Sequence, residues 1–219
     1  MKHYFAFWQR LRSASLLLLL TLAGCTNDLV VDADFPAPLV EPLPQTIGVY
    51  FDEEFRQYTH TEDTEDRSKW IITSGPAQVE LFNQVLPHVF NQSHELKSLP
   101  TAEAPVNVDL VLHPQVNEFQ YAIPRETKFK VFEVWIKYNL TAMDPEGNLI
   151  ADWIVTAYGK TPTAFMQSDE EAMDAAVEVA LRDLGANLSI AMPRVPELKH
   201  WLDNHPATQA ARQTVTNGS

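Results

Sequence analysis

The chain has 219 residues, of which 45% are hydrophobic, so it is long enough for one ordinary domain with its own core. It carries 16 Lys and Arg side chains against 29 Asp and Glu, a formal charge of −13, and such a surface repels the phosphate backbone of nucleic acids. The single cysteine, Cys25, excludes an internal disulfide, a CxxC redox pair and a cysteine-rich zinc site, because each needs at least two cysteines. The composition therefore predicts a folded, acidic protein with no nucleic acid among its partners.

The N-terminus has the pattern of a secretory signal peptide. The basic side chains before residue 13 stand without any acid, and residues 14–23 form a largely apolar run that ends in small residues. A membrane-spanning helix needs about 20 apolar residues, and extending this run backwards would bury Arg10 and Arg12 in hydrocarbon. We therefore expect residues 1–24 to be a cleaved signal peptide and not a permanent transmembrane anchor.

The signal segment closes with Leu22-Ala23-Gly24-Cys25, which resembles the lipobox of bacterial lipoproteins. The resemblance implies cleavage between Gly24 and Cys25, after which Cys25 carries a thioether-linked diacylglyceryl group and an N-terminal acyl chain such as palmitate. One acyl chain holds a protein only marginally, whereas two or more anchor it stably. Thr26 is not the Asp that retains lipoproteins in the inner membrane under the family's sorting rule, so the resemblance implies the outer membrane and a periplasm-facing domain. The alternative is that Cys25 is only a small residue near an ordinary cleavage site.

Composition divides the mature chain into three parts. Residues 25–45 combine four prolines with acidic side chains, which predicts a lipidated, proline-rich tether that stays extended instead of packing. Residues 204–219 are short of large apolar side chains and are expected to be a flexible tail. The globular domain is then predicted to span residues 46–203. Loss of the basic signal peptide makes the mature chain more acidic still, so its body should stand off an anionic membrane surface.

Two elements are expected in the first half of the domain. Residues 47–51 form a short apolar strand, and the acidic stretch 52–66 after it is typical of a surface loop. Ser74 then offers an N-cap and Pro76 suits a first turn, so a helix is predicted, which Pro87 must kink or end. Its apolar side chains recur at helical spacing: Val79, Phe82, Leu86 and Val89, with Val85 and Phe90 beside them.

Three strands are expected next. Residues 106–112 alternate apolar and polar side chains, and the strand resumes after Pro114 towards Tyr121. Residues 131–159 predict a hairpin, because the even positions of its first strand and the odd positions of its second are apolar. Between them, Asp144-Pro145-Glu146-Gly147 suits a type I turn. Pairing apolar with apolar side chains gives the register Leu140 opposite Ala151, Tyr138 opposite Trp153 and Ile136 opposite Val155.

A second helix is predicted after Ser168, which forms a capping box with Glu171. An apolar stripe then continues to Leu188, and Pro193 ends the helix before a short docking segment. The order strand, helix, three strands, helix predicts an α+β fold. We expect a single compact domain with an antiparallel or mixed sheet of about four strands and two main helices on one face.

No catalytic signature is found in the sequence. A Gly-rich phosphate loop, a GxSxG elbow, an HExxH motif and a CxxC motif are all missing, so neither an enzyme nor a cofactor is expected. The stretch 52–66 could hold calcium or another divalent ion, but it lacks the ligand spacing and the glycine of an EF-hand, and a solvated loop without metal is expected. The other histidines show no zinc-ligand spacing. The side chains weighed as ligands are Asp52, Glu53, Glu54, His60, Glu62, Asp63, Glu65 and Asp66.

The predicted hairpin has a second face, which points away from the two helices. Its register places four large side chains there together: Trp135, Ile150, Ile154 and Tyr158. Large apolar patches on a protein surface commonly mark binding sites. The alternative is that the proline-rich segment, the chain around Tyr121 or the C-terminal segment covers this face.

Taken together, these features resemble the small periplasm-facing lipoproteins that assist transport or assembly in the outer membrane. The resemblance rests on the lipobox, since element order alone is a weak guide to function. It implies a non-enzymatic accessory or assembly factor that binds an envelope protein, or a second copy of itself, through a sheet edge or the Trp135 face. A carrier of a lipid or other apolar ligand is the alternative and needs an apolar cavity. An envelope hydrolase is a further alternative and needs carboxyl groups that converge in a cleft.

Overall fold

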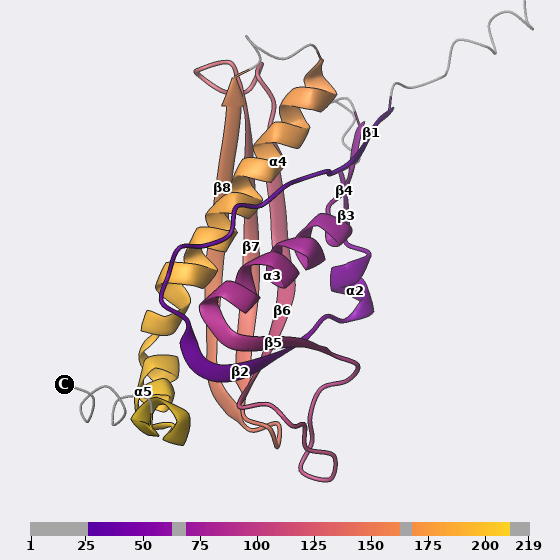
Figure 1. The fold of residues 1–219 in the computed structure, drawn as a ribbon. Coiled ribbons are helices and arrows are strands. Elements are labelled where there is room, and N and C mark those ends of the chain that lie inside the picture. The colour runs from indigo at the N-terminus through magenta and orange to yellow at the C-terminus, as the bar shows by residue number, and fades with distance from the viewer. Residues whose placement is uncertain (1–25, 63–68, 163–167, 211–219) are drawn as a thin grey trace, which may run out of the picture.

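A mixed five-stranded sheet and a smaller three-stranded sheet organise the fold (Figure 1). The structure is a computed structural model that describes residues 26–62, 69–162 and 168–210. The strands are β1 (Thr26–Val30), β2 (Leu43–Tyr50), β3 (Thr59–Glu62), β4 (Lys69–Thr73), β5 (Phe90–Leu96), β6 (Leu110–Ala122), β7 (Val131–Met143) and β8 (Leu149–Pro162). The helices are α2 (Glu53–Arg56), α3 (Gly75–Val89), α4 (Asp169–Ala186), the π-helix η2 (Asn187–Ala191), the 3₁₀-helix η3 (Met192–Arg194) and α5 (Pro196–Asn204).

The large sheet has the strand order β5-β2-β6-β7-β8. Strands β5, β2 and β6 are parallel, whereas β6, β7 and β8 form an antiparallel meander. In the small sheet, β4 lies between β1, to which it is parallel, and β3, to which it is antiparallel. The predicted α+β class with a mixed sheet is confirmed, although the sheet has more strands than expected.

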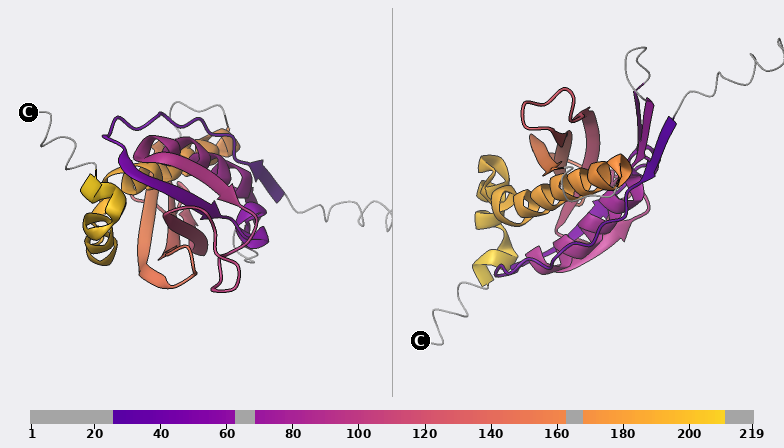
Figure 2. Two further views of the ribbon diagram at one scale, coloured as in Figure 1. Left: turned by 60° about the horizontal axis from the view of Figure 1, so that its bottom comes forward. Right: turned by 90° about the horizontal axis from the view of Figure 1, so that it is seen from above.

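Helices α3 and α4 lie on the same side of the large sheet, as expected (Figure 2). Their apolar stripes and the even-numbered side chains of β7 form the core, in which Phe82, Leu184 and Ile136 are fully buried. Helix α4 crosses β8 at very close range, because a Cβ built on Gly159 would lie 2.0 Å from the carbonyl oxygen of Ala176. Only glycine allows the two backbones to approach this closely.

The predicted turn of the β7–β8 hairpin is confirmed, but the predicted register is wrong by two residues. The Gly147 amide donates to the Asp144 carbonyl over 3.0 Å, and Gly147 has a φ of +88°. The Asp144 amide also donates to the Asn148 carbonyl, which lengthens the loop, and pairing then shifts between Ala142 and Met143. The observed pairs are Leu140 with Trp153, Tyr138 with Val155 and Ile136 with Ala157. A shift of two residues keeps each side chain on its predicted face.

The proline-rich segment is extended, as predicted, but it packs on the domain instead of forming a free tether. β1 starts at Thr26 and pairs with β4, and β2 already begins at Leu43. Apolar side chains between the prolines and acids are buried: Leu29, Val31 and Phe35. Proline prevents helix formation and removes a donor, but it does not prevent an extended chain from burying its other side chains. The packed part of the chain therefore starts about twenty residues before the predicted boundary at residue 46.

The C-terminal prediction also needs correction. Beyond α5 the chain is helical again over residues 206–210, and the Gln45 side chain donates to the Thr208 hydroxyl over 2.5 Å. His205 approaches Asp109 with 3.7 Å between Nε2 and Oδ1. The first part of the predicted flexible tail is therefore docked on β2 and on the chain before β6. Residues 211–219, the predicted signal peptide 1–24 and Cys25 lie outside the described residues.

The stretch 52–66 is not a simple loop. Asp52 caps the short helix α2 by accepting the Phe55 amide over 2.7 Å, and Phe55 is buried against Phe51 and Phe82. β3 follows within the same stretch. Local capping and aromatic burial outweigh the acidic composition here.

Candidate interaction surface

The face of β6, β7 and β8 that points away from α3 and α4 is called the outer face below. Strand alternation produces it: Val134 and Ile136 of β7 are fully buried, whereas Trp135 between them is half-buried and points to the other side. Trp135 therefore lies on the face predicted from the sequence pattern.

Trp135 and Tyr158 form the aromatic centre of the outer face. They are direct partners in the β7–β8 ladder, and their ring centroids lie 5.3 Å apart with 35° between the ring planes. The Tyr158 hydroxyl donates to Oε1 of Glu133 over 3.0 Å. Local desolvation, and then the bond to the Glu133 carboxylate, raise the pKa of Tyr158, so the hydroxyl stays protonated and continues to donate. The pair is thus held in a defined position.

A shallow hollow of about 290 Å³ lies beside Trp135. Charged and polar groups surround it: Glu118, Gln120, Lys137 and Thr156. The Lys137 ammonium is paired with the Glu118 carboxylate, and this hydrogen bond holds the pKa of Glu118 below its usual value. An aromatic centre with a rim of polar groups is the arrangement found at protein interfaces.

Of the other two predicted surface residues, one is on the outer face and one is not. Ile154 stands opposite Asn139 on this face and is 52% exposed. Ile150 lies at the irregularity after Leu149, is half-buried and packs against the core. It also lines an open groove of about 810 Å³ between the hairpin and α5, together with Trp201. The prediction for Ile150 is wrong because strand alternation does not continue through a bulge.

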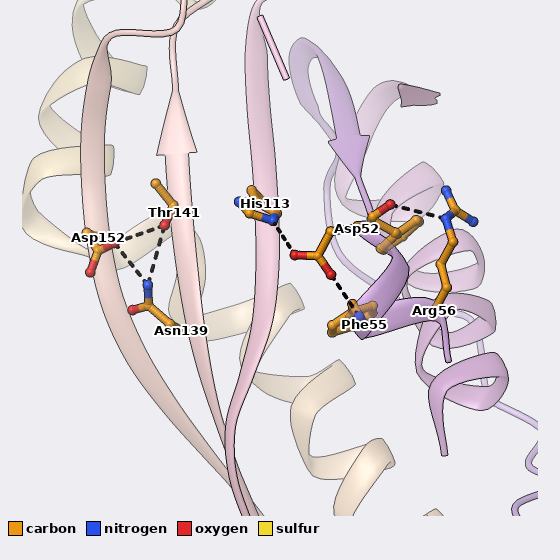
Figure 3. A network of polar contacts seen from close by, with 8 residues as sticks. Asp52, Phe55, Arg56, His113, Asn139, Thr141 and Asp152 are labelled. Atoms are coloured by element: carbon orange, nitrogen blue, oxygen red, sulfur yellow. Dashed lines mark hydrogen bonds and ion pairs between the residues drawn. The ribbon is translucent and has the colours of Figure 1, made fainter. Parts of the chain in front are cut away.

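A row of polar side chains crosses the outer face closer to the β7–β8 turn (Figure 3). His113 of β6 is opposite Thr141 of β7, which is opposite Asp152 of β8. The Thr141 hydroxyl donates to Oδ2 of Asp152 over 2.9 Å, and the side-chain amide of Asn139 donates to the same oxygen over 3.1 Å. These bonds tie β7 and β8 together at the polar end of the face.

The Asp52–His113 pair completes this row and was not predicted. Nε2 of His113 lies 3.0 Å from Oδ2 of Asp52, and its ring lies 5.4 Å from that of Tyr50. Because 61 residues separate the two partners, no local sequence signal could have paired them. Asp52 also caps α2, and the nearby Thr141 hydroxyl is bonded to Asp152. The Asp52 carboxylate and the Thr141 hydroxyl therefore both have structural roles.

The edge of the sheet is partly closed beside the outer face. The outward-pointing amide of Tyr158 donates to Oδ2 of Asp183 on α4 over 3.1 Å. The adjacent Gly159 lies directly under α4. The Asp183 carboxylate therefore occupies a backbone donor that another strand would need for pairing at this position.

The candidate metal ligands of the stretch 52–66 do not form a cluster among the residues that the structure describes. Asp52 is a helix cap, and His60 stacks on Phe119 with 4.7 Å between ring centroids. Within residues 26–62, 69–162 and 168–210, no three His, Cys, Asp or Glu side chains could share a metal ion. Asp63, Glu65 and Asp66 lie outside the described residues.

An apolar hollow lies beneath residues 35–40 and can be compared with the cavity that a carrier of an apolar ligand would need. It has a volume of about 250 Å³ and lies between the segment 35–40 and the helices α3, α4 and η2. Leu81, Val85 and Ile190 contribute to its lining. Sites for small molecules commonly have about 300–1,000 Å³, so this hollow is small for a lipid. In the same described part of the chain, no helix is long and apolar enough to cross a membrane.

No family model matches the chain, and no curated protein matches it either. Among solved structures it is similar to a DUF330-family protein from Xanthomonas campestris, with a TM-score of 0.49 and 13% identity over 74% of this chain and 92% of that one. It is also similar to a minor lipoprotein from Acinetobacter baumannii, with a TM-score of 0.41 and 11% identity over 73% of this chain and 96% of that one. Proteins named as lipoproteins are therefore among its structural neighbours. Because neither likeness reaches a TM-score of 0.5, the function is inferred below from this chain's own residues.

Proposed function

We propose that this chain is a bacterial lipoprotein, acylated on Cys25 and held in the outer membrane with its domain in the periplasm. Its role is that of a non-enzymatic accessory or assembly factor that binds another envelope protein through the outer face. The observation that carries the proposal is the Trp135–Tyr158 pair, which lies on the outer face of the sheet. Large aromatic side chains in partly desolvated positions are typical anchors of protein interfaces.

The surroundings of Trp135 support a protein as partner. The ring is fixed by Tyr158, which is itself held by Glu133, so little conformational entropy is lost when a partner covers it. The ion pair of Lys137 with Glu118 beside the hollow offers both charges to a complementary surface.

The anchor and the described fold are compatible. Thr26, the residue after Cys25, already belongs to β1, so an acyl group on Cys25 would be attached directly to a strand of the small sheet. Membrane fractionation of a Cys25→Ser variant tests this part of the proposal. We expect the variant to lack the lipid and to be lost from the outer membrane fraction. A variant that is still processed and still membrane-bound would contradict it.

A carrier of an apolar ligand is the second candidate, supported by the apolar hollow beneath residues 35–40. Ile190 lines this hollow and is 52% exposed, so Ile190→Asp can change it without opening the core. If the protein is a carrier, lipids extracted with the wild type should be lost from this variant. Equal lipid content in both proteins, or none, would remove the candidate.

The interface is tested by in-cell crosslinking of the wild type and Trp135→Ala. We expect the crosslinked species to decrease at least tenfold, because truncating an interface anchor often costs more than about 2 kcal/mol of binding. Trp201→Ala is the matched control: it removes a half-buried tryptophan from α5 and should leave the crosslinks unchanged.

A second variant separates binding from folding. Thr156→Glu adds a charge at the hollow beside Trp135, at an exposed position, and removes no packing. It should abolish the same crosslinks while the thermal melt stays unchanged. Crosslinks that persist in both Trp135→Ala and Thr156→Glu would show that the outer face is not the interface.

A further inference from the structure

The loop that joins β6 to β7 has an unusual composition for this acidic chain. Residues 123–130 read Ile-Pro-Arg-Glu-Thr-Lys-Phe-Lys, so three of the 16 Lys and Arg side chains fall within this one short loop. Phe129 at its tip is 78% exposed. Among the described residues, no other Phe, Tyr or Trp is found with the exposed large hydrophobic side chains. A solvent-exposed aromatic ring between two lysines is typical of a segment that contacts lipid. The ring enters the membrane–water interface, and the ammonium groups contact the phosphates of the lipid headgroups.

Hydrogen bonds fix the conformation of the tip of this loop. The Lys130 amide donates to the Thr127 carbonyl over 3.4 Å, and Lys130 has a φ of +56°. The Thr127 hydroxyl accepts the Val131 amide over 2.9 Å and donates to the Val131 carbonyl over 3.0 Å. Lys128 and Phe129 therefore occupy the two central positions of a closed turn, where their side chains project away from the body.

This tip lies at the end of the molecule from which the acyl anchor would leave. Asn27 and Arg125 line the same hollow of about 360 Å³, and Asn27 is two residues after Cys25. The start of β1 is fixed there, because Thr26 is paired with Lys69 of β4. β1 and the β6–β7 connection both lie at the upper end of the domain in Figure 1.

We propose that the turn Thr127–Lys130 docks the domain on the membrane surface. The Phe129 ring enters the boundary between headgroups and acyl chains, and the ammonium groups of Lys128 and Lys130 contact the phosphates of anionic phospholipids. The inference rests on the proposed function in one respect, since the acyl groups on Cys25 bring the loop to the lipid. What the inference adds is the orientation of the domain on the membrane. The end at which β1 begins faces the membrane, and the β7–β8 turn points away from it.

The attraction is local to the turn. Carboxylates occupy the same end of the domain, at Asp169 and Glu170 in the first turn of α4, and Glu126 in the loop accepts the Ile123 amide. Exposed charges separated by more than about 8–10 Å are largely screened at physiological salt. Carboxylates of the body that lie farther than this from the membrane therefore oppose the contact of the projecting turn only weakly.

The test uses the complete lipidated protein in vesicles of phosphatidylethanolamine and phosphatidylglycerol. Cys25 is the only cysteine and its thiol is consumed by the acyl linkage, so an introduced cysteine can be labelled alone with an environment-sensitive fluorophore. Lys128→Cys places the label beside Phe129. Leu149→Cys is the matched control, because Leu149 is 65% exposed and stands at the opposite end of β7 and β8.

We expect the label at residue 128 to be shielded at least twofold from an aqueous quencher relative to the label at residue 149. Adding Phe129→Ser to the Lys128→Cys protein should remove the shielding. Equal quenching at both positions would overturn the inference.

Two further measurements separate the possible failures. Flotation of the lipidated protein with the vesicles reads the anchor alone: a protein that does not float contradicts the proposed function and this inference together, whereas floating with equal quenching contradicts only the inference. Shielding that appears in native outer membranes but not in pure lipid vesicles would show that the turn binds a membrane protein, and the lipid assignment would be wrong.

Discussion

The two faces of β7 are made by alternate residues of one strand, yet they differ in what they contribute. Towards α3 and α4, the side chains from Phe132 to Leu140 at even positions are at most 1% exposed. On the outer face the odd positions between them, 133 to 139, are half-buried and polar, with Trp135 as the exception. The inner face therefore carries the stability of the domain, and the outer face is free to carry binding. Substitutions on one face should leave the other function intact.

The largest expected difference is between two isoleucines. Ile136→Ala on the inner face should lower the free energy of unfolding by about 2–5 kcal/mol, because it leaves a cavity in a fully packed core. Ile154→Ala on the outer face should change it by no more than about 0.5 kcal/mol, because that side chain is 52% exposed. Urea denaturation of both variants measures the contrast. Similar losses in the two would mean that the outer face is also packed.

A second expected difference concerns pH. Burial lowers the pKa of His60, which stacks on Phe119, and Nε2 finds no hydrogen-bond partner among the described residues. When a histidine has a lower pKa in the folded state than in the unfolded chain, the unfolded chain binds the proton at a higher pH. Protonation then favours unfolding. Stability should therefore fall as pH drops through about 6.5, the ordinary pKa of histidine, towards the lower folded value.

Thermal melts of the wild type and His60→Phe between pH 8 and pH 5 check this prediction. The wild type should lose more melting temperature over this interval than the variant, in which nothing titrates at position 60. Parallel curves for the two proteins would exclude His60 as the cause.

A smaller effect is expected at Tyr138, which lies on the inner face with no hydrogen-bond partner for its hydroxyl in the described chain. Burial holds the pKa of Tyr138 well above its usual value, so the group is neutral and simply desolvated. Tyr138→Phe removes an unsatisfied polar atom and should raise the free energy of unfolding by about 1 kcal/mol. A loss of stability on urea denaturation would reveal a hydrogen bond to this hydroxyl.

The smallest effect is expected on the outer face, at the Tyr158 hydroxyl. Tyr158→Phe keeps the ring against Trp135 and removes only the bond to Glu133. The free energy of unfolding should fall by no more than about 1 kcal/mol, since the freed carboxylate is accessible to water. Partner crosslinks should weaken less than in Trp135→Ala. A complete loss of crosslinks would show that the hydroxyl itself contacts the partner.

Local sequence patterns predicted the elements that depend on neighbouring residues. Alternation assigned Trp135, Ile154 and Tyr158 to one face, and the turn chemistry at Asp144 and Gly147 was correct. The register was missed because hydrogen bonds between Asp144 and Asn148 lengthen the loop and displace Ile150.

Features that depend on distant residues could not be predicted in this way. The packing of Leu29 and Val31 requires β4, whose position relative to β1 no spacing within the segment reveals. The Asp52–His113 pair likewise joins residues brought together only by the order of β2 and β6 in the sheet. The signal that could have indicated packing of the segment is the presence of Leu29, Val31 and Phe35 among the prolines and acids.

The pairing of β1 with β4 also limits how far the domain can travel. A free tether over residues 25–45 could extend roughly 70 Å, far enough to let the domain search the space above a membrane. Because β1 begins at Thr26, a lipid on Cys25 would leave almost no slack, and the reach of the protein would be the length of its own body. Under the proposed function, a component that meets the outer face from the opposite side of the periplasm would have to span the remaining distance itself.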